Sequence, residues 1–253
     1  MLAGRVKVVT DSRYKVVTIK NSIVLYDAGL ISEPLLSLFD GEQQGAKNAG
    51  EYPNHSRTGI GRAKVVYFSL ENRNLVLKHY YRGGLLASVL KDTYFGLSIE
   101  NSRAFREWKL LKIMKGFGLP VPDAVAARIV KKTLTYHADL ITEEIENINT
   151  LSDSLSTDNL EPSMWKNIGV CIKSFHNHDI YHADLNARNI LVRNDGSVYL
   201  IDFDNSYVRK GTGAWKMANL ARLRRSLIKF KGNTGEFNFE ESDWELLLEG
   251  YLV

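Results

Sequence analysis

The stretch Ile-Tyr-His-Ala-Asp-Leu-Asn-Ala-Arg-Asn-Ile-Leu-Val at residues 180–192, followed by Val-Tyr-Leu-Ile-Asp-Phe-Asp at residues 198–204, decides the expected fold. Two short β-type runs, at 190–193 and 198–201, flank the tetrapeptide Asn-Asp-Gly-Ser. Asp-Gly between two such runs is a strong signal for a β-hairpin. The sequence therefore predicts a hairpin with polar residues at its open end.

The register of this hairpin predicts which polar side chains meet. A symmetric four-residue loop would pair Arg193 with Val198 and, at the open end, Asn189 with Asp202. Cross-strand neighbours have Cβ atoms about 4.5–5.5 Å apart. An amide oxygen and a carboxylate at that separation suit a hard cation that also binds phosphate oxygens. Asp184 precedes Asn189 on the loop that leads into the hairpin.

These three residues have the spacing of a phosphotransferase site of the protein-kinase type. In that template one Asp orients a hydroxyl, while an Asn and a second Asp hold magnesium on ATP. Asp184 is then the candidate catalytic base, and Asn189 and Asp202 are the candidate magnesium ligands, with ATP and Mg²⁺ as cofactors. An ordinary hairpin with polar ends is the alternative, but this motif combination is rare by chance.

A kinase-like site also needs a loop over the phosphates, a cation and a partner for that cation. Gly59 and Gly61 are the candidate phosphate-binding loop, although a plain turn explains this short pattern equally well. Lys78 ends an apolar strand downstream and is the candidate cation, with a solvated edge lysine as the alternative. Glu107 on a predicted helix is its candidate partner, and Glu143 is a further candidate for cofactor binding.

Bulk properties set wide limits on function. The chain has 253 residues, of which 44% are hydrophobic and 25% charged, so it can build one or two globular domains. A net charge of +4 suits an anionic partner such as a nucleotide, a phospholipid or a phosphorylated glycolipid. The single cysteine, Cys171, excludes an internal disulfide framework and is expected to be buried. Without a signal peptide or an apolar run of about 18 residues, we expect a cytoplasmic protein.

The order of predicted elements indicates an α+β fold with two lobes, the first rich in strands and the second a reduced helical lobe. We expect a first domain at residues 1–145 and a second at 146–253. An apolar island at 35–39 has no assigned element, and a capping box formed by Ser242 and Glu245 opens the last helix. Strands are expected at 16–19, 23–26, 63–70, 75–81, 124–131 and 134–141, and helices at 103–115, 164–176 and 215–229.

Several positions depart from the protein-kinase pattern. Ala183 stands where protein kinases usually have Arg, Asn186 where many have Lys, and Asp204 where they have Gly. The chain beyond Asp202 has room for about two helices, which is too little for a peptide-docking lobe. The acceptor is therefore expected to be smaller than a protein.

Specific pieces of the chain carry a closer resemblance. They are Leu-Lys-His-Tyr-Tyr-Arg-Gly-Gly at 77–84, Arg-Ala-Phe-Arg-Glu at 103–107, Gly-Leu-Pro-Val-Pro at 118–122, His-Ala-Asp-Leu-Asn-Ala at 182–187 and Asn-Leu-Ala-Arg-Leu-Arg-Arg-Ser-Leu at 219–227. With them, roughly residues 20–252 resemble the 3-deoxy-D-manno-octulosonic acid (Kdo) kinases of Gram-negative lipopolysaccharide synthesis.

This resemblance implies a protein-kinase-like fold and ATP-dependent phosphorylation of the 4-hydroxyl of Kdo on a lipid A precursor. Asp184 would be the base, Asn189 and Asp202 the metal ligands, and Lys78 with Glu107 the ATP clamp. The Kdo–lipid A precursor would be the partner, and neither nucleic acid nor a protein substrate is expected. The enzyme would lie peripherally on the anionic cytoplasmic face of the inner membrane.

Basic side chains suit the carboxylate of Kdo and the phosphates of lipid A. Arg82 and Arg188, which flank the predicted site, are the candidate substrate ligands, and the cluster Arg222, Arg224 and Arg225 is a further source of positive charge. Tyr80 is one of several aromatic residues that could meet a membrane surface, although packing explains it equally well.

Two other functions stay open on the sequence. One is a different small-substrate kinase on the same scaffold, of the heptose or aminoglycoside type. The other is a catalytically inactive kinase fold that serves as a lipid-binding module. The complete set of candidate catalytic residues argues against this second function.

Overall fold

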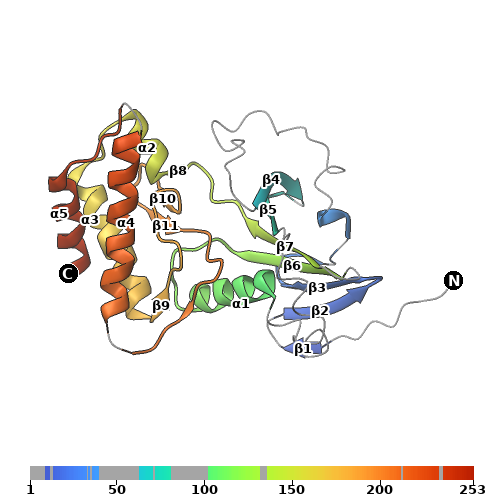
Figure 1. Cartoon of the computed structure of the whole chain (residues 1–253). Helices are drawn as coiled ribbons and strands as arrows, with labels where there is room; N and C mark the ends of the chain where they lie inside the picture. The colour runs from blue at the N-terminus through green and yellow to red at the C-terminus, as the bar shows by residue number, and fades with distance from the viewer. Residues whose placement is uncertain are drawn as a thin grey trace. The chain divides into compact units, whose positions relative to one another are not determined.

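The computed structural model describes residues 9–11, 14–32, 34, 36–39, 63–70, 72–80, 102–131, 136–211, 213–233 and 236–253. The chain divides into two compact units, one made of Met1–Lys109 with Asp123–Glu144 and the other of Leu110–Pro122 with Ile145–Val253. The first is built on a sheet and the second mainly on helices (Figure 1). This arrangement confirms the predicted α+β fold class; the division after residue 145 stays a prediction.

The first unit contains a seven-stranded antiparallel sheet in the order β1-β2-β3-β6-β7-β5-β4. Successive side chains of a strand point to opposite faces. On β5, Leu75 and Leu77 are therefore buried in the core, while Lys78 projects from the other face. The strands are β1 (Val9–Asp11), β2 (Tyr14–Ile19), β3 (Ser22–Tyr26), β4 (Ala63–Leu70), β5 (Arg73–Tyr80), β6 (Ala124–Lys131) and β7 (Tyr136–Glu143).

The apolar island at 35–39 contributes to this core. Its described part forms a short 3₁₀ helix, η1 (Leu36–Phe39), and Leu38 and Phe39 pack in one buried cluster with Leu75 and Leu77. Between β4 and β5 the predicted turn at 71–74 is too long. Leu70 pairs with Arg73, and Asn72 has a φ of 62°, so a two-residue connection brings β5 in earlier.

Helix α1 (Arg103–Gly116) confirms the helix predicted at 103–115. The Ser102 hydroxyl accepts a hydrogen bond from the Phe105 N–H at 3.4 Å, as a capping residue does. The predicted end is wrong, because Gly116 is still helical. The left-handed residue is Gly118, with a φ of 72°, and the Leu119 N–H then bonds to the Met114 carbonyl.

The second unit contains four whole helices, the C-terminal half of α1 and two small sheets in its described residues. The helices are α2 (Leu151–Thr157), α3 (Pro162–Asn177), α4 (Ala214–Asn233) and α5 (Glu241–Leu252). One sheet has the order β11-β10-β8 and the other pairs β12 with β9. Their strands are β8 (Asn149–Thr150), β9 (Ile180–Tyr181), β10 (Ile190–Val192), β11 (Val198–Leu200) and β12 (Tyr207–Val208).

Helices α3 and α5 run side by side and touch through two glycines (Figure 1). A Cβ on Gly169 would lie 2.0 Å from the Leu247 carbonyl oxygen, and one on Gly250 would lie 2.0 Å from that of Lys166. No side chain larger than hydrogen fits at either position. Cys171, on the same helix α3, is buried as predicted, and burial raises the pKa of its thiol to about 12.

Two helix starts differ from expectation. The capping box of α5 is not Ser242 with Glu245, because both lie inside the helix; instead the Asp243 carboxylate accepts the Glu240 N–H at 2.8 Å. Helix α2 was missed, although the Thr150 hydroxyl caps it by accepting the Asp153 N–H at 3.0 Å. In the part of the chain that the structure describes, no helix combines the length and apolarity needed to span a membrane.

Candidate active site

The predicted hairpin forms, but its register is shifted by one residue. Ile190 pairs with Leu200 and Val192 with Val198, so Asn189 lies opposite Ile201 rather than Asp202. The predicted pairing of Arg193 with Val198 is therefore wrong.

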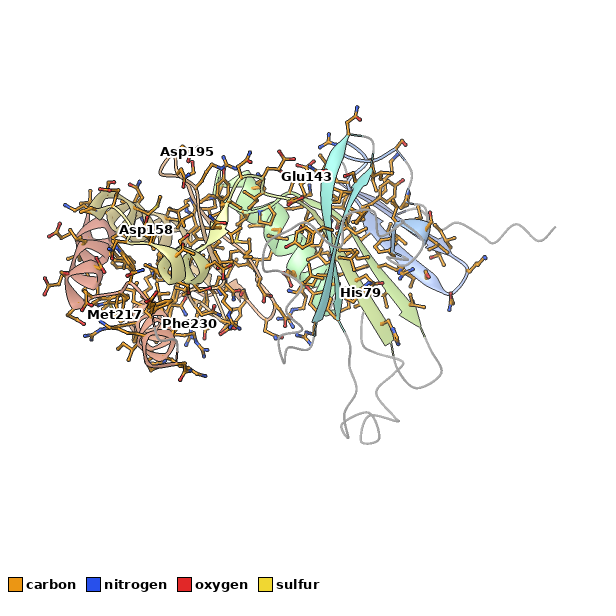
Figure 2. The ribbon with its side chains drawn as sticks, turned by 90° about the horizontal axis from the view of Figure 1, so that it is seen from above. His79, Glu143, Asp158, Asp195, Met217 and Phe230 are labelled. Carbon is orange, nitrogen blue, oxygen red and sulfur yellow. The ribbon has the colours of Figure 1, made fainter. Side chains whose placement is uncertain are left out.

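The cause is the turn at Asn194, Asp195 and Gly196, in which Asp195 is labelled in Figure 2. The Arg193 N–H donates to the Ser197 carbonyl at 3.0 Å, and the Gly196 N–H donates back to the Arg193 carbonyl. Gly196 has a φ of 89°, which a side chain rarely tolerates. A three-residue loop with a left-handed glycine is one residue shorter than the predicted four-residue loop, so Arg193 faces Ser197 and the register moves by one residue.

Both candidate metal ligands still lie at the open end of this hairpin. The Ile201 N–H donates to the Asn189 carbonyl at 3.0 Å, and Asp202 is the next residue. Asp202 has a φ of 62°, an uncommon conformation for a residue with a side chain, so the chain turns sharply at this carboxylate. Backbone strain of this kind occurs often at functional sites.

Asp184 and Asn189 are joined by a direct hydrogen bond. The Asn189 side chain is almost buried, and its Nδ2 donates to the Asp184 carbonyl at 2.9 Å. Because the amide nitrogen is used in this way, the amide oxygen points in another direction. The Asp184 carboxylate is 60% exposed, and it accepts hydrogen bonds from Asn186 Nδ2 at 3.1 Å and Arg222 Nη1 at 3.2 Å.

His182 connects the catalytic loop to the hairpin. Its Nδ1 accepts the Asp184 N–H at 3.2 Å, so the proton lies on Nε2, which is 3.0 Å from the Ile201 carbonyl oxygen. The ring also packs on Phe203, with centroids 4.7 Å apart. His182 therefore supports the loop by hydrogen bonding at both ring nitrogens.

Helix α4 contacts the same loop through Asn219, Arg222 and Ser226, here called the α4 polar stripe. Residues with this spacing lie on one side of a helix. Asn219 accepts the His182 N–H at 3.3 Å and donates to the His182 carbonyl at 3.0 Å. The Ser226 hydroxyl accepts the Ala187 N–H at 3.2 Å. The sequence analysis identified only the arginines of this helix. The helical spacing of Asn219, Arg222 and Ser226 could have indicated that these three polar residues share one side of it.

The chain returns to the catalytic loop soon after Asp202. The Ser206 hydroxyl accepts the Ala183 N–H at 3.0 Å, and Tyr207 pairs with Tyr181 in the small sheet of β12 and β9. The segment between Asp202 and α4 is therefore short and tied down at its start.

The first unit brings Lys78 and Glu107 together. Lys78 Nζ lies 3.3 Å from both carboxylate oxygens of Glu107, whose side chain is 4% exposed. The Tyr80 hydroxyl donates to the same carboxylate, and Lys78 Nζ lies 4.7 Å from the centre of the Tyr80 ring. A buried, charged pair of this kind fixes the direction of the lysine amine. Tyr80 is itself buried, which overturns its suggested membrane contact.

Comparison with known proteins agrees with this geometry. The model of the lipopolysaccharide kinase (Kdo/WaaP) family matches residues 55–251. The chain belongs to this family. The match includes every candidate site residue from Gly59 to Asp202, and also the α4 polar stripe.

The chain is also similar to curated relatives named 3-deoxy-D-manno-octulosonic acid kinase. It is 43% identical to the one from Actinobacillus succinogenes over 182 residues, which cover 70% of this chain and 75% of the relative. It is 35% identical to the one from Vibrio vulnificus strain YJ016 over 230 residues, or 91% and 94% of the two chains. The similarity to the one from Photobacterium profundum is also 35%, over 233 residues.

The remaining predicted site residues differ in what the structure shows of them: some have described contacts, and others lie outside the described residues. The Glu143 carboxylate, labelled in Figure 2, forms an ion pair with Arg73, and its N–H donates to the Asp123 carbonyl at 2.8 Å. Its side chain and amide both have protein partners, so a role in cofactor binding stays a prediction. The guanidinium of Arg188 lies over the Phe230 ring of α4, 5.0 Å from its centre. Gly59, Gly61 and Arg82 lie outside the described residues.

Proposed function

We propose that this chain transfers the terminal phosphoryl group of ATP to the 4-hydroxyl of Kdo on a Kdo–lipid A precursor, in lipopolysaccharide core biosynthesis. The observation that carries the proposal is the Asp184–Asn189 hydrogen bond at the mouth of the hairpin, in a chain that aligns with 94% of a relative named Kdo kinase. Membership of the family does not by itself say which hydroxyl accepts the phosphate. The hairpin geometry does not by itself say which molecule carries that hydroxyl.

Asp184 is the proposed base. Its carboxylate is exposed enough to meet an acceptor, and each oxygen receives one protein hydrogen bond, which leaves lone pairs for a hydroxyl. A carboxylate in this place orients the hydroxyl and takes its proton as the new bond to phosphorus forms.

Asn189 and Asp202 fit a magnesium ion by their chemistry. The Asn189 amide is oriented by its bond to Asp184, so the oxygen is the atom left for a cation, and Asp202 supplies a carboxylate at the same end of the hairpin. Oxygen ligands are those that Mg²⁺ prefers. Magnesium bound to ATP neutralises the charge that develops on the phosphates during transfer.

Lys78 is the proposed cation for the α- and β-phosphates, with Glu107 holding its amine in direction. Gly59 and Gly61 would cover the phosphates through backbone amides, and Glu143 would contact the nucleotide. Arg82 and Arg188 are proposed for the anionic groups of the glycolipid.

The test is the product. The purified full-length protein is incubated with ATP, Mg²⁺ and Kdo–lipid A precursor, and the glycolipid is analysed by mass spectrometry and by NMR. We expect one added phosphate on the 4-hydroxyl of Kdo. Parallel reactions with heptosylated core and with aminoglycosides separate this substrate from those of other small-substrate kinases; transfer to one of these and not to Kdo would refute the proposal.

The Asp184→Asn variant separates an enzyme from an inactive lipid-binding module. The change keeps the shape and removes the base, so transfer should fall by about 10³-fold while ATP binding survives. Tight lipid binding by the natural protein with no phosphate transfer would favour the module instead.

We also propose that helix α4 meets an anionic membrane surface. Its outer side carries Met217 and Ile228, which are 59% and 52% exposed, together with Arg225 and Lys229, and Met217 is labelled in Figure 2. Apolar and basic residues on one helical surface are typical of interfacial helices. The exposed Val170 of α3 provides the control.

Sedimentation with vesicles that contain or lack anionic lipid tests this contact. We expect binding to the anionic vesicles that is weakened about tenfold by Met217→Gln with Ile228→Gln, and little changed by Val170→Gln. Equal effects of the two variants would exclude α4 as the contact surface.

A further inference from the structure

The carboxylate of Asp184 has a cationic neighbour that the kinase motifs do not supply. Arg222 Nη1 of helix α4 donates to Asp184 Oδ1 at 3.2 Å, and the two side chains are 45% and 60% exposed. The other two arginines of the cluster behave differently. Arg224 pairs with Glu241 at 2.5 Å and lies over the Trp244 ring, while Arg225 is on the exposed side of the helix. The structure thus singles out Arg222.

The position that holds a lysine in many protein kinases is neutral in this chain. Asn186 stands there, and its Nδ2 donates to both the carboxylate and the carbonyl of Asp184. Asn186 is therefore turned back onto its own loop. Arg222 arrives from a different element and brings a full positive charge to the same carboxylate.

We infer that Arg222 binds the carboxylate of the acceptor sugar and so selects an acidic sugar. This inference rests on the proposed function. One donor of the guanidinium is used by Asp184, and the planar group has further N–H donors that match a carboxylate in a two-point contact. Kdo carries its carboxylate on the ring carbon two positions from the one that bears the 4-hydroxyl. A hydroxyl at Asp184 therefore brings that carboxylate close to Arg222.

The positions of the other groups favour the acceptor over ATP as the partner of Arg222. Asn189 and Asp202 occupy the hairpin, and Asn189 holds Asp184 by its carbonyl. Arg222 approaches the opposite end of the residue, its carboxylate, from α4. The acceptor hydroxyl must also bind at the Asp184 carboxylate. Arg222 therefore lies on the acceptor side of Asp184.

The experiment combines two enzymes with two acceptors. The acceptors are the natural Kdo glycolipid and the same molecule with its carboxylate reduced to a primary alcohol; the enzymes are the natural protein and Arg222→Gln. On the natural acceptor, Arg222→Gln should lower kcat/KM by about 10–100-fold, the range of a charged hydrogen-bonded contact. On the reduced acceptor the same variant should lower it by less than about threefold.

Arg209→Gln is the matched control. Arg209 is exposed in the same unit and lies over the Tyr181 ring, so its loss should leave kcat/KM within about twofold on both acceptors. Circular dichroism checks that each variant is folded. Should Arg222→Gln fail to fold, the natural protein alone still tests the inference, through its preference for the natural over the reduced acceptor.

Four results would overturn the inference. An equal loss on both acceptors means that Arg222 only positions Asp184, and a loss confined to the KM for ATP means that it binds nucleotide phosphate. Equal rates of the natural protein on both acceptors mean that the carboxylate is not recognised, and they leave the proposed function intact. Transfer to neither acceptor refutes the proposed function, and this inference with it.

Discussion

The two units hold their functional groups in different ways. In the first unit, Lys78 and Glu107 fix each other through a contact between two charged side chains. In the second, the backbone of the catalytic loop is held by side chains from other elements: His182 by Asn219, Ala187 by Ser226, and Ala183 by Ser206. A charge pair sets the direction of one amine, whereas bonds to the backbone set the path of a whole segment.

This difference predicts how each unit fails. Removing a charge from the first unit should lower activity much more than stability, because the sheet does not depend on the pair. Disturbing the packing of the second unit should lower stability first, because α3 packs against β9, which leads into the catalytic loop, and against β11, the second strand of the hairpin. The predictions below separate these two outcomes.

The largest effect is expected for Gly169→Ala, at the contact of α3 with α5. The new methyl group would lie 2.0 Å from the Leu247 carbonyl oxygen, so the helices must separate. We expect a loss of about 3 kcal/mol or more in the free energy of unfolding. Urea unfolding, followed by tryptophan fluorescence, measures it.

Gly232→Ala is the control for that change. Gly232 also lies in a helix, but a Cβ there meets no atom within 4 Å. Alanine should stabilise helix α4 by up to about 1 kcal/mol. If both variants have the same stability, the close contact of α3 and α5 does not govern the folding of this unit.

The next effect is expected for Glu107→Gln in the first unit. Glutamine keeps the shape and can still accept the Tyr80 hydroxyl, but it removes the charge that holds Lys78. We expect kcat/KM to fall by about 10²-fold, since misplacing a group that positions substrate costs this much. The unfolding free energy should change by only about 1 kcal/mol.

Lys166→Gln is the matched control, because it removes the exposed ion pair with Glu249. It should leave kcat/KM unchanged and alter the free energy of unfolding by no more than about 1 kcal/mol. A Glu107→Gln enzyme with full activity would show that the buried pair only stabilises the sheet.

The sequence predicted the features that depend on residues close together in the chain, and it missed those that depend on distant residues or on backbone conformation. The strands, the long helices, the Asp-Gly hairpin and the placing of Lys78 opposite Glu107 follow from local patterns and motif spacing. The hairpin register did not, because it depends on the left-handed conformation of Gly196, and any four-residue reading of the turn pairs the wrong residues. The contacts of α4 with the catalytic loop join residues far apart in sequence, and only packing brings them together.

A third prediction concerns His176, which is buried in the second unit beside Trp215 and Tyr251. Burial, with smaller contributions from Lys216, Lys173 and His182, lowers its pKa to about 4, although a hydrogen bond with Asn219 acts in the opposite direction. The unfolded chain, with a histidine pKa near 6.5, therefore binds more protons between these two values. Stability contributed by this residue is full above pH 6.5 and is lost as the pH falls toward 4.

Between pH 7 and pH 5 this loss should be about 2 kcal/mol. The measurement is the urea midpoint of the natural protein and of His176→Asn at both pH values, so that the other ionisable groups cancel. The natural protein should lose more stability than the variant. An equal loss would show that His176 is not held neutral by its surroundings.

The smallest effect is expected for Ser226→Ala, which removes one of the bonds from the α4 polar stripe to the backbone of the catalytic loop. The Ala187 N–H loses its partner at 3.2 Å, at a cost of about 1 kcal/mol. Ser174→Ala is the control, because its hydroxyl donates to the Cys171 carbonyl within its own helix, and its loss should be nearly neutral. Since Ala187 lies between Asp184 and Asn189, Ser226→Ala should also lower kcat by a few-fold, while Ser174→Ala leaves it unchanged. A drop in stability with no drop in kcat would mean that the stripe holds the loop in the fold without setting the position of Asp184, and the contrast between the two units would then be one of stability alone.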